Sequence, residues 1–222
     1  MLKKNLILLL IGLLLLSFTA CTNSDEKPQQ NQTTNVDASV EDASAKHTIL
    51  FEKSIDKIKG TMPECEIYEG GASTFLSFPY KIRNFETEAI YTLSNDKKYA
   101  TLTRMFFSIP DATSFPSNTE YETHINETLK EYYLLFVEDL GLGTLQLDLY
   151  QSNGDVPTSL VCKTEQEFSD TVKPFFLGTN TGISRIKINA YTIEKEIPVG
   201  IIINDGSYQA FDIEITIQHT SN

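Results

Sequence analysis

Apolar and polar positions alternate in several short segments of residues 47–222 and recur at helical spacing in three others. Alternation with a period of two predicts half-buried strands, and apolar residues three and four positions apart predict amphipathic helices. The predicted strands are 76–82, 87–93, 99–107, 145–149, 186–190, 199–203 and 211–217. The predicted helices are one from Ile49 to the stop signal Gly60, one opened by residues 114–118 and ended by Gly141, and 164–176.

Local signals refine several of these elements. Thr164 with Glu167 three residues later has the pattern of a capping box, which predicts where the last helix begins. Pro79 predicts an edge position or a bulge for the first strand, because proline cannot donate to a strand ladder. The run 199–203 is continuously apolar, as in a strand covered on both faces.

The order of the elements is α-β-β-β-α-β-α-β-β-β. Short sequential strands joined by turns predict an α+β fold, with mostly antiparallel sheets and two or three helices packed on one face. About 175 residues are enough for one domain with its own core, or for two very small ones; we predict one. The segment Phe78-Pro79-Tyr80 and the strand–helix order through residue 140 loosely resemble the PsbP-like α/β sandwich.

The first twenty-one residues have a different pattern. Lys3 and Lys4 precede an apolar run over 6–16, and the small residues Thr19 and Ala20 then lead to Cys21. As a helix the run spans only ~16 Å, about half of a bilayer core, so it predicts a signal peptide rather than a permanent transmembrane helix.

This order of features resembles the bacterial lipobox, with Phe18 where that family usually has Leu or another aliphatic residue. In that family the peptide is cut before the cysteine and the thiol carries lipid. The resemblance implies lipidation at Cys21 and a protein anchored at the extracytoplasmic face of the cell membrane. The alternative is an ordinary secretory signal that is cut near Ala20.

Residues 22–46 contain no aromatic residue, Leu or Ile, and are rich in small polar side chains. Such a segment cannot bury enough apolar surface to offset its ordering entropy, so we predict a disordered tether. A flexible coil of 25 residues has an r.m.s. reach of about 25–30 Å. The predicted organisation is a signal peptide over 1–20, the lipidated cysteine and tether over 21–46, and one domain over 47–222.

The chain is acidic, with a formal net charge of −12, and loss of Lys3 and Lys4 with the signal peptide takes it to −14. Such a charge disfavours nucleic acid and anionic lipid headgroups, and favours cationic peptides, metal ions or basic protein patches as partners. The acidity can equally serve solubility alone. Cys65 and Cys162 allow either one disulfide or two buried free thiols.

Catalytic motifs are missing from the sequence. It contains no HExxH, no GxSxG and no pair of histidines four residues apart, so we predict no metal site and no cofactor. The aromatic residues Tyr132, Tyr121 and Phe115 are the candidates for lining a ligand groove, although core packing is the default interpretation of these side chains. The leading hypothesis is a non-enzymatic domain that binds a ligand or protein partner at the cell envelope. The alternative is an envelope hydrolase whose carboxylates are brought together by folding.

Overall fold

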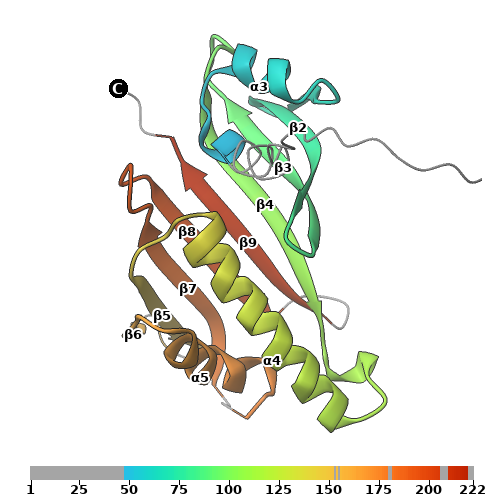
Figure 1. Cartoon of the computed structure of the whole chain (residues 1–222), viewed down its shortest axis with the longest axis vertical. Helices are drawn as coiled ribbons and strands as arrows, with labels where there is room; N and C mark the ends of the chain where they lie inside the picture. The colour runs from blue at the N-terminus through green and yellow to red at the C-terminus, as the bar shows by residue number, and fades with distance from the viewer. Residues whose placement is uncertain (1–47, 153, 155, 180–181, 206–209, 220–222) are drawn as a thin grey trace, which may run out of the picture. The chain divides into compact units, whose positions relative to one another are not determined.

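The computed structural model describes residues 48–219, except 153, 155, 180–181 and 206–209. These residues form a nine-stranded antiparallel sheet with helices packed against it (Figure 1). The predicted α+β class is therefore confirmed. The predicted signal peptide, Cys21 and the tether lie outside the described residues.

The sheet has the order β1-β2-β3-β4-β9-β8-β7-β5-β6. Its strands are β1 (Glu66–Gly70), β2 (Ser73–Ile82), β3 (Phe85–Leu93), β4 (Ala100–Pro110), β5 (Leu145–Gln151), β6 (Thr158–Cys162), β7 (Ile183–Tyr191), β8 (Pro198–Asp205) and β9 (Ala210–Gln218). The helical elements are η1 (Ile49–Phe51), α3 (Ile55–Thr61), η2 (Ala112–Ser114), α4 (Asn118–Leu134), the π-helix η3 (Leu135–Asp139) and α5 (Glu165–Phe176). The β4–β9 pair lies in the middle and joins the first four strands to the last five.

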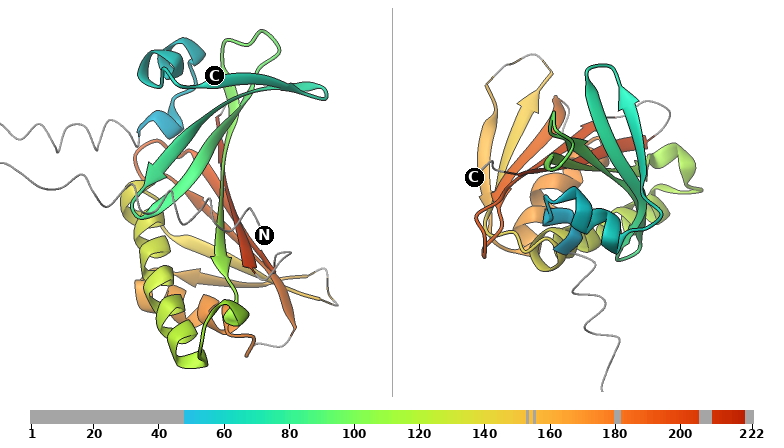
Figure 2. Two further views of the ribbon diagram at one scale, coloured as in Figure 1. Left: turned by 90° about the vertical axis from the view of Figure 1, so that its right-hand side faces the viewer. Right: turned by 90° about the horizontal axis from the view of Figure 1, so that it is seen from above.

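One face of the sheet is buried, and α4 and α5 lie on that side (Figure 2). The register aligns fully buried side chains in rows across the strands, because alternate residues point to the same face. One such row runs through Met105, Ile215, Ile201 and Ile188. Since the described core lies within one compact unit, Ala38–Asn222, we expect a chain of residues 38–222 to fold by itself.

The last helix begins as predicted. The Thr164 side chain accepts a hydrogen bond from the Glu167 backbone N–H at 3.2 Å, and the Glu167 carboxylate accepts one from the Thr164 N–H. The predicted helix from Ile49 to Gly60 is wrong as a single helix. It is broken over 52–54, because Ala100 N–H donates to the Lys53 carbonyl and draws this segment to the start of β4.

The strand predictions are confirmed for seven strands, while β1 and β6 were not predicted. Pro79 does lie at a local edge, because β1 pairs with β2 only as far as Ser77. The prediction that 199–203 is covered on both faces is wrong. Gly200 and Ile202 are only half-buried, since they point to the second face of the sheet.

The structure also decides between the two alternatives for the cysteines. Cys65 directly precedes β1 and Cys162 lies in β6, which are the two opposite edge strands of the sheet. Both are free thiols. A disulfide needs Cα atoms within about 7 Å, whereas eight strand spacings of about 4.8 Å separate these edges along the sheet.

Candidate ligand-binding site

A pocket of about 410 Å³ lies where α4 and its π-helical extension η3 end. Three segments far apart in sequence form its walls. Its lining comprises Thr48 and Phe51 from the start of the domain, the segment 138–141, and the residues Thr192, Ile193, Glu194, Lys195 and Ile197 of the β7–β8 connection. We name this the α4-end pocket.

The π-helix shapes the wall that residues 138–141 form. Leu140 N–H bonds to the Leu135 carbonyl at 3.0 Å, five residues back, and Leu142 N–H bonds to the Phe136 carbonyl at 2.9 Å. Gly141 then takes a φ of +61°, a conformation that glycine adopts without strain. Single π-turns of this kind occur frequently at functional sites.

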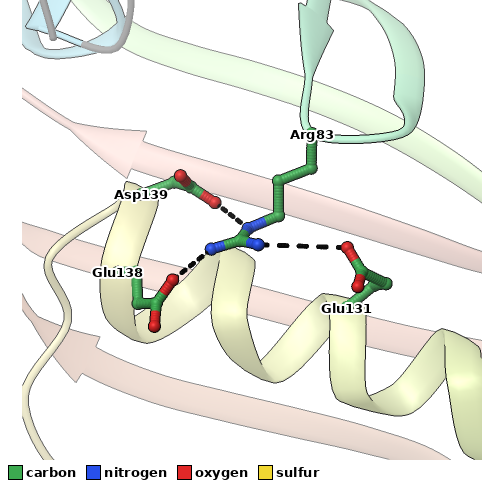
Figure 3. A network of polar contacts seen from close by, with 4 residues as sticks. All are labelled: Arg83, Glu131, Glu138 and Asp139. Atoms are coloured by element: carbon green, nitrogen blue, oxygen red, sulfur yellow. Dashed lines mark hydrogen bonds and ion pairs between the residues drawn. The ribbon is translucent and has the colours of Figure 1, made fainter. Parts of the chain in front are cut away.

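Arg83 fixes the acidic residues of this wall (Figure 3). It lies in the turn between β2 and β3, with a φ of +51°, and its guanidinium extends to the end of α4. Its Nε donates to Asp139 Oδ2 and its Nη2 to Glu138 Oε2, while Nη1 lies 3.9 Å from Glu131 Oε2. Burial lowers the pKa of Arg83, but the bonds to Asp139 and Glu138 outweigh burial and raise the pKa above its ordinary value.

The opposite wall is held by backbone hydrogen bonds. Ile193 N–H donates to the Gly141 carbonyl at 2.9 Å, and Gly143 N–H donates to the Tyr191 carbonyl at 3.0 Å. The buried Thr192 closes the turn, because its Oγ1 accepts from Ile197 N–H at 3.0 Å. The wall formed by residues 138–141 and the wall formed by the β7–β8 connection are therefore joined by main-chain hydrogen bonds.

The chemistry of the α4-end pocket is both acidic and apolar. Its lining carries the carboxylates Glu138, Asp139 and Glu194 and the ammonium group of Lys195, and the guanidinium of Arg83 pairs with Glu138 and Asp139. Four apolar side chains share the lining: Phe51, Leu140, Ile193 and Ile197. Ile193 is 70% exposed, which is unusual for a large aliphatic side chain and leaves it free to contact a ligand. The arrangement suits a cation attached to an apolar group.

The residues predicted to line a groove lie elsewhere. Tyr132 is 1% exposed and stacks on Phe85, with ring centroids 4.4 Å apart, and burial raises its pKa. Tyr121 is 3% exposed and donates from its hydroxyl to the Phe176 carbonyl at 2.8 Å. Phe115 packs on Tyr121 at a centroid distance of 5.3 Å. All three have the environment of core residues, and none lines the α4-end pocket.

Sequence reasoning missed Arg83 and Ile193. Arg83 stands in a turn, and its partners follow 48 to 56 residues later, so no spacing rule connects them. The signal for Ile193 was available, since the residue is a lone aliphatic followed by Glu194, Lys195 and Glu196. An isolated apolar residue in a charged turn is a candidate contact residue. Only the structure shows that Ile193 is exposed, which is the second condition for such a role.

Comparison of the chain with protein-family models, with curated proteins and with solved structures found no match. The resemblance to the PsbP-like sandwich therefore stays a prediction.

Among the described helices, none is long and apolar enough to cross a membrane. Within residues 48–219, the gaps aside, no group of three or more His, Cys, Asp or Glu side chains is placed to hold a metal ion.

Proposed function

We propose that this chain is a lipid-anchored, extracytoplasmic binding protein that holds a cationic, partly apolar ligand in the α4-end pocket. The class of ligand that fits best is a peptide segment with a Lys or Arg side chain next to an aliphatic or aromatic one. The observation that carries the proposal is the lining of the pocket, where four apolar side chains meet the Glu194 carboxylate, the Lys195 ammonium group and the two carboxylates that pair with Arg83.

The shape and charge of the site support this assignment. Ligand pockets are typically concave and mostly apolar, with a few polar groups that orient the ligand. Here Glu194 and Glu138 supply the polar groups, and Ile193 with Phe51 supplies the apolar contact. An acidic protein also attracts cationic ligands over distances of about a Debye length, which increases the rate of encounter.

The position of the pocket in the chain adds to the case. Thr48 lines the pocket and is the first described residue of the domain. The predicted tether therefore joins the domain at the pocket, and anchoring at Cys21 would keep a ligand there within a few nanometres of the membrane. A peptide segment of a membrane protein is a partner within that reach.

Titration calorimetry with two synthetic peptides tests the proposal. The first is the amide Leu-Lys-Leu-Lys and the second is Leu-Glu-Leu-Glu, each added to the chain 38–222. We expect binding of the lysine peptide only, because a glutamate peptide is repelled by Glu194 and finds Glu138 and Asp139 already paired with Arg83. Glu194→Lys should weaken the binding by about threefold to fivefold, which is the upper part of the range for one exposed ion pair.

Glu127→Lys is the matched control. It makes the same charge change on an exposed position of α4, eleven residues and about 16 Å before Glu138 along the helix axis. Its affinity for the lysine peptide should stay within twofold of that of the unaltered chain. Equal affinities of the Glu194→Lys and Glu127→Lys variants would mean that general charge, and not the pocket, attracts the peptide.

A further inference from the structure

The two edges of the sheet differ in their protection against a further strand. The strands β1 and β6 are the outermost ones, and the backbone groups on their outer sides have no partner strand among the described residues (Figure 1). Open edges can pair with strands of other chains, and proteins usually prevent this with charged residues or proline on the edge. The residues along each edge therefore indicate whether it is closed to an added strand.

The edge formed by β1 and the end of β2 is protected. β1 contains Glu66 and Glu69, and all five of its residues are exposed. Beyond Ser77, where the pairing with β1 stops, β2 contains Pro79 and Lys81. A second copy of the chain at this edge would meet like charges and a proline that cannot donate a hydrogen bond.

The edge formed by β6 has no such protection. Its five residues, Thr158–Cys162, include no charged residue and no proline. Leu160 is 41% exposed and pairs with the buried Leu147, so it points to the core face. Val161 is 56% exposed and pairs with the exposed Gln146, so it points to the second face. β6 thus presents apolar side chains on both faces beside open backbone groups, which is the surface that an added strand covers.

The residues that flank β6 limit the length of an added strand. Pro157 directly precedes β6, and Lys163 directly follows it. Proline cannot donate a ladder hydrogen bond and lysine opposes pairing at an edge, so the open part of this edge is the five residues of β6.

We infer that β6 pairs antiparallel with β6 of a second copy of this chain, so that the two nine-stranded sheets form one continuous sheet. Two five-residue strands overlap in full only when the two-fold axis passes through the middle residue, Leu160. Leu160 then lies opposite Leu160 of the second copy, and Val161 lies opposite Ser159 of that copy. This axis is perpendicular to the sheet, so the core faces of both copies are on the same side.

Charge and position favour a second copy as the added strand. The chain has a net charge of −12, so two copies repel each other over most of their surfaces, and the uncharged β6 is an edge where they can approach. The lipid anchor proposed above would hold copies on one membrane surface and raise their effective concentration. The inference itself does not depend on the anchor or on the α4-end pocket.

Sedimentation velocity of the chain 38–222 tests the pairing. The sedimentation coefficient should rise toward that of a dimer between about 5 µM and about 500 µM, since two short strands make a small and weak interface. Val161→Lys should raise the dissociation constant at least about tenfold, because lysine on an edge strand opposes pairing. Ile67→Lys is the matched control on the opposite edge, where Ile67 is 45% exposed, and it should leave the dissociation constant within about twofold.

Disulfide cross-linking tests the register in a Cys65→Ser, Cys162→Ala background. Leu160→Cys should cross-link two copies under mild oxidation, because opposed Cα atoms of an antiparallel pair are about 4.5–5.5 Å apart. Val161→Cys should not cross-link, since the two copies of this position are offset by two residues and their Cα atoms are about 8 Å apart, beyond the reach of a disulfide. Thermal unfolding midpoints confirm that each variant is folded.

The outcomes are distinct. Association that Val161→Lys weakens and Ile67→Lys does not, together with the Leu160→Cys cross-link, supports the inference. A chain that stays monomeric at every concentration, an equal loss in both lysine variants, or the absence of the Leu160→Cys cross-link overturns it. Glu194→Lys should leave the association unchanged, so the pairing of β6 and the α4-end pocket can fail independently.

Discussion

Arg83 donates from Nε to Asp139 Oδ2 across 56 residues of sequence, and so fastens the β2–β3 turn to the end of η3. Its side chain is 20% exposed, and its carboxylate partners lie close to one another around it. Arg83→Ala should therefore lower the free energy of unfolding by about 1–3 kcal/mol, because partly buried carboxylates lose their counter-charge. Urea denaturation measures this loss.

A glycine variant separates the charge from the backbone. Arg83→Gly removes the same ion pairs but relieves the positive φ of +51°, so it should be less destabilising than Arg83→Ala by up to about 1 kcal/mol. Arg185→Gln removes only an exposed contact of the guanidinium with the Tyr150 ring, 4.4 Å from the ring centroid, and should change stability by less than about 1 kcal/mol. A larger loss for glycine than for alanine would contradict the assigned backbone strain.

The capping box gives a second prediction. Thr164→Ala removes the acceptor of the Glu167 N–H at the start of α5, and should lower the free energy of unfolding by about 1 kcal/mol. Thr123→Ala in α4 is the control, since that hydroxyl only back-bonds to the Thr119 carbonyl at an exposed position. Alanine there should be neutral or slightly stabilising. If Thr164→Ala and Thr123→Ala lowered the free energy of unfolding equally, the Thr164 cap would contribute nothing beyond an ordinary exposed threonine hydroxyl.

His219 predicts a pH dependence of stability. Burial lowers its pKa to about 4, with Glu52 opposing and Lys53 adding to the shift, and its Nε2 lies 2.7 Å from Thr103 Oγ1. Between about pH 6.5 and 4 the unfolded chain binds the proton and the folded chain does not. The contribution of neutral His219 to the free energy of unfolding is therefore fully present above pH 6.5, and it decreases as the pH drops toward 4.

Replacement of the imidazole isolates this effect from other titrating groups. His219→Gln retains hydrogen-bonding capacity without a titration near neutral pH, so its loss of stability from pH 7 to pH 5 should be smaller than that of the unaltered chain. Denaturant unfolding at the two pH values gives the comparison. An identical loss in both chains would place the pKa of His219 near its ordinary value.

Lipidation is tested at Cys21. Cells that express the full chain should incorporate labelled palmitate into it, and the Cys21→Ser variant should lose the label and leave the membrane fraction. Label that persists in the Cys21→Ser variant would exclude this cysteine as the acceptor. The Cys65→Ser variant, which alters another thiol, should retain full labelling.

Sequence reasoning succeeded where the cause of a structure is local. The capping box of Thr164 and Glu167 and the edge position of Pro79 depend on groups within a few residues or on one missing donor. The α+β class follows from the same alternation, because strands with one apolar face need helices or a second sheet to cover it. Local patterns thus predicted most of the elements.

Prediction from sequence failed for contacts between residues that are distant in the chain. The extended segment at Lys53 exists because Ala100 bonds to it, and helical spacing on either side concealed this break. Core packing, the default interpretation of Tyr132, agrees with its burial, but its partners Phe85 and Phe107 lie 47 and 25 residues earlier and could not be identified from sequence. The α4-end pocket likewise needs three segments to meet, so its residues could not be grouped before the fold was known.

The position of β9 also bears on how the chain is made. This strand is the last of the described strands in sequence, yet it lies between β4 and β8 and supplies the row that contains Ile215. The two halves of the sheet therefore cannot join until β9 has left the ribosome. If the chain is exported as its first residues predict, the long-range pairing of β9 with β4 can form only after β9 has crossed the membrane, so the polypeptide can cross before the sheet is complete.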